Sequence, residues 1–161
     1  MTANMENIEI ITLNEKISED FYRLSAEYLP GSSHEKMRKY FGIFSDSFIA
    51  AMHGNELAGV AFGWLRSLEF PGDDSFVLDG IAVRQEFQGR GIGRRMLNRF
   101  EASAKEYGAE TVSVGSAEGG AEKFYIACRY VPVEYKIWEN GRPVLKKAFE
   151  SFDDYLFFQT I

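Results

Sequence analysis

The strongest constraint on the fold is a glycine-rich turn that joins an apolar run to a long amphipathic pattern. The turn reads Gln88-Gly89-Arg90-Gly91-Ile92-Gly93, the apolar run occupies residues 76–83, and helical spacing of apolar residues continues over 92–107. A strand, a glycine turn and a helix in this order leave backbone N–H groups bare where the helix dipole is positive. Arg94 and Arg95 add formal positive charge. The segment therefore predicts a site for a phosphate-bearing ligand.

Three kinds of glycine loop bind phosphates, and their spacing separates them. A P-loop needs Lys-Ser or Lys-Thr after its second glycine, and the chain contains neither dipeptide. A dinucleotide loop needs Gly-x-Gly-x-x-Gly directly after a strand and an acid about twenty residues on. Here the glycines alternate, the loop starts well after Val83, and the apolar segment 111–114 carries no acid. The third pattern, Gln/Arg-x-x-Gly-x-Gly/Ala, is met in full by Gln88, Gly91 and Gly93.

This third pattern resembles the pyrophosphate loop of the GCN5-related N-acetyltransferase (GNAT) superfamily, whose members bind acetyl-CoA. The order of the neighbouring segments is similar too. Ile81-Ala82-Val83 ends the strand before the loop, a helix and the strand 111–115 follow it, and a short helix carries Phe124-Tyr125. The resemblance covers residues 56–135. Two positions depart from it: Glu118 replaces an asparagine that contacts the cofactor in many members, and Arg129-Tyr130 replaces Gly-Phe.

The resemblance implies a set of cofactor-binding residues along the central strand, the glycine loop and the short helix. Backbone N–H groups of the loop would hold the pyrophosphate, and the pantetheine would lie beside the strand, with the Ile81 N–H meeting the thioester oxygen. The implied cofactor-binding residues are Ile81, Ala82, Val83, Gln88, Gly89, Arg90, Gly91, Ile92, Gly93, Arg94, Glu118 and Phe124.

Two side chains are candidates for proton transfer. Tyr125 matches the family tyrosine that protonates the departing thiolate, although a tyrosine in this pattern also suits a core position with its hydroxyl at the surface. Asp79 is a lone acid in an apolar strand, where a charge is costly unless it is paired or functional. Related enzymes often carry an acid here as the base, acting directly or through water. A structural salt bridge or a contact with a substrate ammonium is the alternative role for Asp79.

The periodicity predicts an α/β (α+β) fold in which residues 1–161 form one domain. We expect a mixed sheet of six to seven strands, parallel at the central pair and antiparallel elsewhere, flanked by about four helices. Gly54-Asn55 and Asn140-Gly141 are typical of hairpin turns. The pattern indicates strands at 8–13, 48–52, 57–65, 76–83, 111–114, 131–138 and 144–149, and helices at 18–28, 34–44 and 92–107. The family resemblance implies a fourth, short helix at 121–125. The aromatic-rich residues 149–158 suit either a homodimer contact or burial within one chain.

The composition of the chain limits the kinds of partner that we expect it to bind. The net charge is −6, which argues against nucleic acid and is compatible with a cationic acceptor. No run approaches the roughly 20 apolar residues of a membrane span, and the polar N-terminus is no signal peptide. One cysteine, Cys128, fits a reducing cytoplasm, and the two histidines, His34 and His53, show no metal-ligand spacing, so we predict no metal site.

The interpretation that joins these observations is a cytoplasmic acetyl-CoA-dependent N-acetyltransferase acting on a primary amine of a small molecule or peptide. A non-catalytic acyl-CoA-binding regulatory module is the first alternative, and a nucleotide-binding regulator is the second. A covalent route through Cys128 would need a neighbouring base, and neither histidine is near it in sequence. The walls of the acceptor site are expected to come from the region of His34, the loop 67–75 and the residues Glu118, Glu134 and Tyr135.

Overall fold

A single seven-stranded sheet organises the molecule. The computed structural model describes residues 7–115, 121–137 and 143–149, and in these the strands run in the order β1-β2-β3-β4-β5-β7-β6. Among the described strands the β4–β5 pair is parallel and the other neighbours are antiparallel, as predicted. The strands are β1 (Ile8–Thr12), β2 (Phe48–His53), β3 (Glu56–Leu65), β4 (Phe76–Val83), β5 (Thr111–Gly115), β6 (Val131–Ile137) and β7 (Pro143–Ala148).

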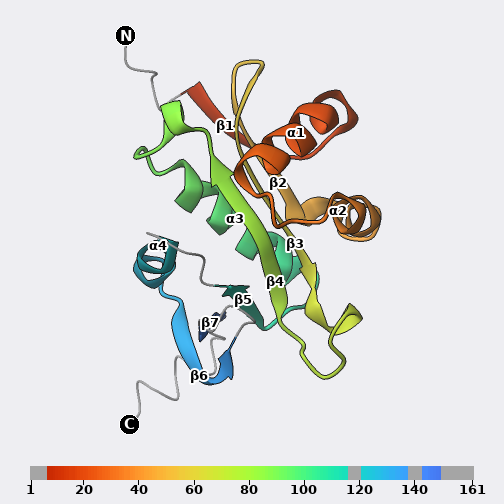
Figure 1. The fold of residues 1–161 in the computed structure, drawn as a ribbon, viewed down its shortest axis with the longest axis vertical. Helices are drawn as coiled ribbons and strands as arrows, with labels where there is room; N and C mark the ends of the chain where they lie inside the picture. Colours follow the sequence, from red (N-terminus) through yellow and green to blue (C-terminus); the bar gives the residue numbers. More distant parts are fainter. Residues whose placement is uncertain (1–6, 116–120, 138–142, 150–161) are drawn as a thin grey trace.

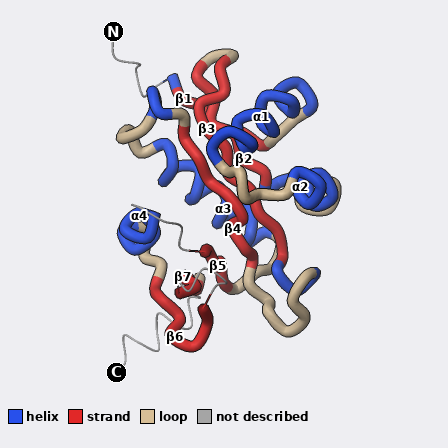
Figure 2. Tube along the Cα trace, in the orientation of Figure 1, coloured by secondary structure: helices blue, strands red, loops and turns tan. Residues whose placement is uncertain are grey.

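Helices cover both faces of the larger half of the sheet. Figure 1 shows α1 (Ser18–Tyr28) and α2 (His34–Phe41) in front of β3, and α3 (Ile92–Glu106) behind the sheet. The apolar face of α3 is buried against β1–β4 through Ile92, Met96, Leu97, Phe100 and Ala104, the spacing expected of an amphipathic helix. The fourth described helix, α4 (Ala121–Ala127), lies on the side of β4 opposite α1 and α2 (Figure 2). None of the described helices has the length and apolarity to cross a membrane.

Most predicted boundaries agree with the structure. β4 spans the predicted residues, and Gly108 ends α3 with a φ of +90°, as expected of a left-handed helix cap. α2 is shorter than predicted, because the N–H groups of Ile43 and Phe44 both turn back to the carbonyl of Tyr40 and end the helix at Phe41. The turn at 140–141 and the tail 152–161 lie outside the described residues.

A β-bulge in β4 determines where the sheet opens. Phe62 of β3 pairs with Gly80, but the next residue, Gly63, pairs with Leu78, so Asp79 is an extra residue without a partner in β3. The parallel pairing of β4 with β5 ends at Leu78 as well. The two central strands therefore part at Asp79, and every later residue of β4 has lost its β5 neighbour.

Replacing Gly63 with alanine is expected to destabilise the fold by several kcal/mol. A Cβ at Gly63 would clash with the Val77 carbonyl oxygen and lie 2.7 Å from Cζ of Phe100, and both neighbours are buried. Denaturant unfolding measures the loss. The matched control is Gly42→Ala, because Gly42 has an ordinary helical φ of −64° and open surroundings. Equal stabilities of the two variants would contradict the close packing of β3 on α3.

Candidate active site

A large cleft follows the line along which β4 and β5 diverge. Its volume is about 1440 Å³, and it runs along β4 between two ends of different chemistry. The glycine-loop end is formed by Gly89, Gly91, Gly93 and Arg94. The Glu69 end is formed by side chains from α2, β3 and the β3–β4 loop, namely Lys36, Trp64, Arg66, Glu69 and Phe70. Asp79, Phe124 and Tyr125 line the cleft as well.

The glycine-loop end presents an uncapped helix start. Gly91 is the N-cap residue of α3, has a φ of +78° and supplies no side-chain cap, and Gly89 has the same φ. This left-handed conformation favours glycine. A Cβ at Gly93 would make an ordinary 3.5 Å contact with Phe124, so packing of the protein alone does not require glycine there. The bare N–H groups and the positive dipole end fit a diphosphate.

Three side chains of the loop brace it rather than point freely into the cleft. Nε2 of Gln88 donates to the Val83 carbonyl at 2.9 Å, and the Gln88 N–H is already bonded to the Gln85 carbonyl. Arg94 donates to the Ala127 carbonyl at 3.2 Å and still lines the cleft. The Arg90 guanidinium lies 5.9 Å from the ring centre of Phe87 and is not among the lining residues. The N–H groups open to a ligand therefore begin at Gly89.

The second half of β4 offers an open strand edge. Ile81, Ala82 and Val83 line the cleft, and one edge of this segment pairs with β3 through Ala61↔Ile81 and its neighbours. On the other edge, the described part of β5 pairs no further than Leu78. Backbone groups beyond the bulge can therefore pair with an amide-bearing ligand, in the manner of an added strand.

Tyr125 brings a buried hydroxyl to the cleft. Its side chain is 6% exposed, and among the described residues its hydroxyl has no hydrogen-bonding partner. Burial raises the pKa of Tyr125 well above its ordinary value, and the nearby Cys128 thiol raises it further. The phenol is thus neutral and available as a donor. Cys128 is buried beside it, and burial raises the pKa of the thiol, which keeps it protonated and unreactive.

Asp79 projects from the bulge into the cleft. Solvent reaches Asp79, but the residue lies among the walls of the cleft, which displace much of the water around its carboxyl group. This loss of hydration raises the pKa of the carboxyl group. A hydrogen bond with Ser32 and the charge of Lys36 act in the opposite direction, and the charge of Glu69 adds to the increase. The carboxyl group therefore has the raised proton affinity of a useful base.

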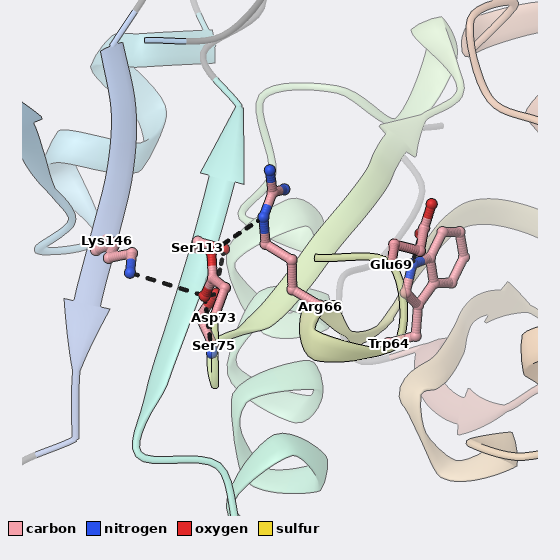
Figure 3. A network of polar contacts seen from close by, with 7 residues as sticks. All are labelled: Trp64, Arg66, Glu69, Asp73, Ser75, Ser113 and Lys146. Atoms are coloured by element: carbon pink, nitrogen blue, oxygen red, sulfur yellow. Dashed lines mark hydrogen bonds and ion pairs between the residues drawn. The ribbon is translucent and has the colours of Figure 1, made fainter. Parts of the chain in front are cut away.

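Glu69 is held from two sides. Nζ of Lys36 lies 2.6 Å from Oε2. Nε1 of Trp64 donates to Oε1 at 2.9 Å, and both of these residues are drawn in Figure 3. Partial burial alone would raise the pKa of Glu69, but these two hydrogen bonds and the charges of Lys36 and Arg66 outweigh it and lower the pKa. Glu69 is therefore ionised at neutral pH.

Asp73 anchors the loop that carries Glu69. Its carboxylate lies 3.1 Å from Nε of Arg66 and 4.0 Å from Nζ of Lys146, and it accepts a hydrogen bond from Oγ of Ser75 at 2.6 Å (Figure 3). The Ser75 hydroxyl is in turn 2.9 Å from that of Ser113 on β5. The network fixes the β3–β4 loop at the Glu69 end of the cleft.

Some of the residues expected to wall an acceptor site line the cleft, and others do not. The loop 67–75 contributes Glu69 and Phe70 to the cleft, whereas His34 packs against the ring of Tyr22 and its neighbour Lys36 lines the cleft instead. Glu118 and the side chains of Glu134 and Tyr135 lie outside the described part of the chain. Trp64 and Lys36 were missed, because a tryptophan in an apolar strand and a lysine on an exposed helix carry no local signal of a site.

Comparison with known proteins identifies the family of the chain. The sequence pattern of the acetyltransferase (GNAT) family matches residues 14–128, and the chain belongs to this family. No curated protein sequence matches the chain.

Solved structures share the fold at low sequence identity. Ard1 from Thermoplasma volcanium is 16% identical with a TM-score of 0.72, over 90% of this chain and 99% of the other. Arabidopsis thaliana Naa50, in complex with the bisubstrate analogue CoA-Ac-MVNAL, is 16% identical with a TM-score of 0.70, over 89% and 99%. A GNAT family acetyltransferase from Elizabethkingia anophelis with acetyl-CoA bound is 22% identical with a TM-score of 0.59, over 89% and 99%.

Proposed function

We propose that the protein transfers an acetyl group from acetyl-CoA to a primary amine by direct transfer within a ternary complex. One observation carries the proposal: in the described part of the chain, the uncapped start of α3, the open edge of β4 and the unpartnered Tyr125 hydroxyl all line one cleft. The diphosphate would be held by N–H groups from Gly89 onward, and the pantetheine would lie along Ile81, Ala82 and Val83. Acetyl-CoA supplies an activated acetyl group as a thioester.

Asp79 is proposed to take the proton from the acceptor ammonium, directly or through water. The freed amine nitrogen forms a bond to the acetyl carbon, and the bond from that carbon to sulfur breaks. The second proton that the nitrogen loses passes through water to the sulfur, which leaves as the thiol of CoA. A backbone N–H of β4, that of Ile81 in our proposal, stabilises the oxygen that becomes negative.

Tyr125 is proposed to donate a hydrogen bond from its hydroxyl group to the departing sulfur. A phenol with a raised pKa is a poor acid toward a thiolate of pKa about 8.5. It is nonetheless always protonated and has no competing partner among the described residues, so a hydrogen bond to the sulfur is its main contribution.

Binding of acetyl-CoA is expected to stabilise the protein against heat. A ligand at 100 times its Kd adds about 2.7 kcal/mol, several degrees in a domain of this size. Acetyl-CoA, CoA, ATP and NAD should be compared side by side by thermal unfolding. We expect shifts with acetyl-CoA and CoA alone. No shift with either, or a shift with ATP or NAD alone, would contradict the proposed cofactor.

A Gly91→Ala variant sharpens this test. A Cβ at Gly91 meets nothing within 4 Å, so the fold has room for it, but the φ of +78° strains any residue other than glycine. The methyl group and the strain fall where the diphosphate approaches the loop, so the shift caused by acetyl-CoA should shrink. Gly54→Ala carries a similar strain, with a φ of +61° and open space, outside the cleft, and should keep the full shift.

A non-catalytic acyl-CoA-binding regulator is the alternative function. It predicts the same thermal shifts but no amine-dependent release of CoA. Following free thiol in the presence of a panel of amines separates the two functions. A small molecule or a peptide as acceptor, a homodimer and a cytoplasmic location remain proposals from the sequence.

A further inference from the structure

The Glu69 end of the cleft already holds an alkylammonium group, that of Lys36. Its Nζ is 2.6 Å from Oε2 of Glu69, and it joins α2 to the β3–β4 loop. The charge of Asp79 also acts on this ammonium. Two carboxylates, Glu69 on one wall and Asp79 on the bulge of β4, thus act on the same cation inside the cleft.

Glu69 is positioned independently of Lys36. Oε1 accepts a hydrogen bond from the indole of Trp64 at 2.9 Å, and this indole is 1% exposed and packs on the ring of Tyr40 with 4.6 Å between ring centres. Figure 3 shows the Glu69 carboxylate lying against the indole. If Lys36 moves away, Trp64 keeps the carboxylate in place with Oε2 open to a new cation.

Lys36 can be exchanged at low cost. Its side chain is 52% exposed, against 21% for Glu69, and a lysine on a four-carbon stem can turn its ammonium to solvent. Exposed ion pairs contribute little to stability. An ammonium brought by a ligand can therefore replace that of Lys36 at Glu69.

We propose that Glu69 is a specificity residue that binds a second ammonium group of the acceptor in place of Lys36. This inference rests on the proposed function. The acceptor class is then an aliphatic diamine or polyamine, with its reacting amine at Asp79 and its other ammonium at Glu69. The methylene chain between them would lie against the aromatic lining of Tyr28, Trp64 and Phe70. The net charge of −6 favours the approach of such a dication.

The first test compares 1,ω-diaminoalkanes of three to eight carbons with n-alkylamines of the same length. The measured quantity is the ratio of kcat/KM for each diamine to that of its monoamine. Wild-type protein is expected to prefer the diamine at its best length. In Glu69→Gln, whose amide oxygen can still accept from Trp64, the ratio should fall about tenfold, as expected for losing a charged hydrogen bond.

Glu19→Gln is the matched control. It removes the same charge from an exposed ion pair, Glu19 with Arg23 on α1, away from the cleft. Its diamine-to-monoamine ratio should equal that of the wild type, so a general loss of electrostatic attraction is separated from a contact at Glu69. Lys36→Met should raise the ratio, because the competing ammonium is gone.

Thermal stabilisation by the best diamine, with CoA bound, measures occupation without turnover. It should be present in the wild type and reduced in Glu69→Gln. Monoamine turnover without a diamine preference, or a ratio unchanged by Glu69→Gln, would overturn this inference and leave the proposed function standing. Diamine binding that depends on Glu69 without release of CoA would support the subsite and contradict the transferase function.

Discussion

Changing Tyr125 to phenylalanine is expected to lower kcat about a hundredfold and to leave the Kd for acetyl-CoA within about twofold. The ring fills the same space between Phe124 and Tyr130, so the cleft keeps its shape. The lost hydroxyl is buried and has no partner among the described residues, so its removal should not lower the free energy of unfolding. The change would act only where the departing sulfur needs a hydrogen-bond donor.

Steady-state kinetics with isothermal titration of acetyl-CoA separates kcat from binding. Tyr107→Phe is a suitable control, because its hydroxyl accepts from the Asp46 N–H outside the cleft. Turnover of Tyr125→Phe equal to that of the wild type would remove Tyr125 from the proposed role. A weakened Kd with unchanged kcat would instead make it a binding residue.

Changing Asp79 to asparagine is expected to reduce kcat/KM about a hundredfold or more, because the variant has no group to take the ammonium proton. The wild-type kcat/KM should fall on the acidic side with an apparent pKa above the ordinary aspartate value of about 3.9, since desolvation raises the pKa of Asp79. This fall of kcat/KM at acidic pH should be absent in Asp79→Asn. A kcat/KM within about twofold of the wild type would exclude Asp79 as the base.

The same substitution should stabilise the protein at neutral pH. A carboxyl whose pKa is raised in the folded state favours folding when it is protonated, and this advantage is lost as pH rises from the unfolded pKa through the folded one. Above both values the enclosed charge lowers the wild-type stability, whereas asparagine carries no charge. Tm of Asp79→Asn should therefore exceed that of the wild type at pH 7, and the difference should shrink toward pH 4.

The parts of the candidate site that could be predicted are those formed by residues consecutive in the sequence. The glycine loop and β4 follow from local spacing, the Phe124-Tyr125 helix follows from the family resemblance, and all three line one cleft. The bulge at Asp79 could not be foreseen, because it is a register shift against a partner strand. The Trp64, Glu69 and Lys36 cluster joins residues up to 33 positions apart, and only tertiary packing brings them together.

Arg129-Tyr130 stands where many members of the family have Gly-Phe, and the structure shows how the two residues are accommodated. Arg129 has a φ of +73°, the conformation that favours glycine, so the glycine of many relatives is replaced at some cost in strain. The buried Tyr130 hydroxyl donates to Oε2 of Glu101 at 2.8 Å, and Nζ of Lys147 lies 3.0 Å from the other oxygen. The hydroxyl that distinguishes Tyr130 from phenylalanine thus has a partner on α3, and Lys147 joins β7 to the same carboxylate.

The short parallel ladder between β4 and β5 has a dynamic consequence. It consists of three residue pairs, Phe76↔Val112, Val77↔Ser113 and Leu78↔Val114, whereas β2 and β3 pair along six. Local unfolding of the sheet should therefore begin at the β4–β5 ladder. The amides of this ladder should exchange with solvent before those of the β2–β3 hairpin. A ligand that spans the cleft would contact both strands and hold them together. Its binding should therefore slow amide exchange most at these three residue pairs.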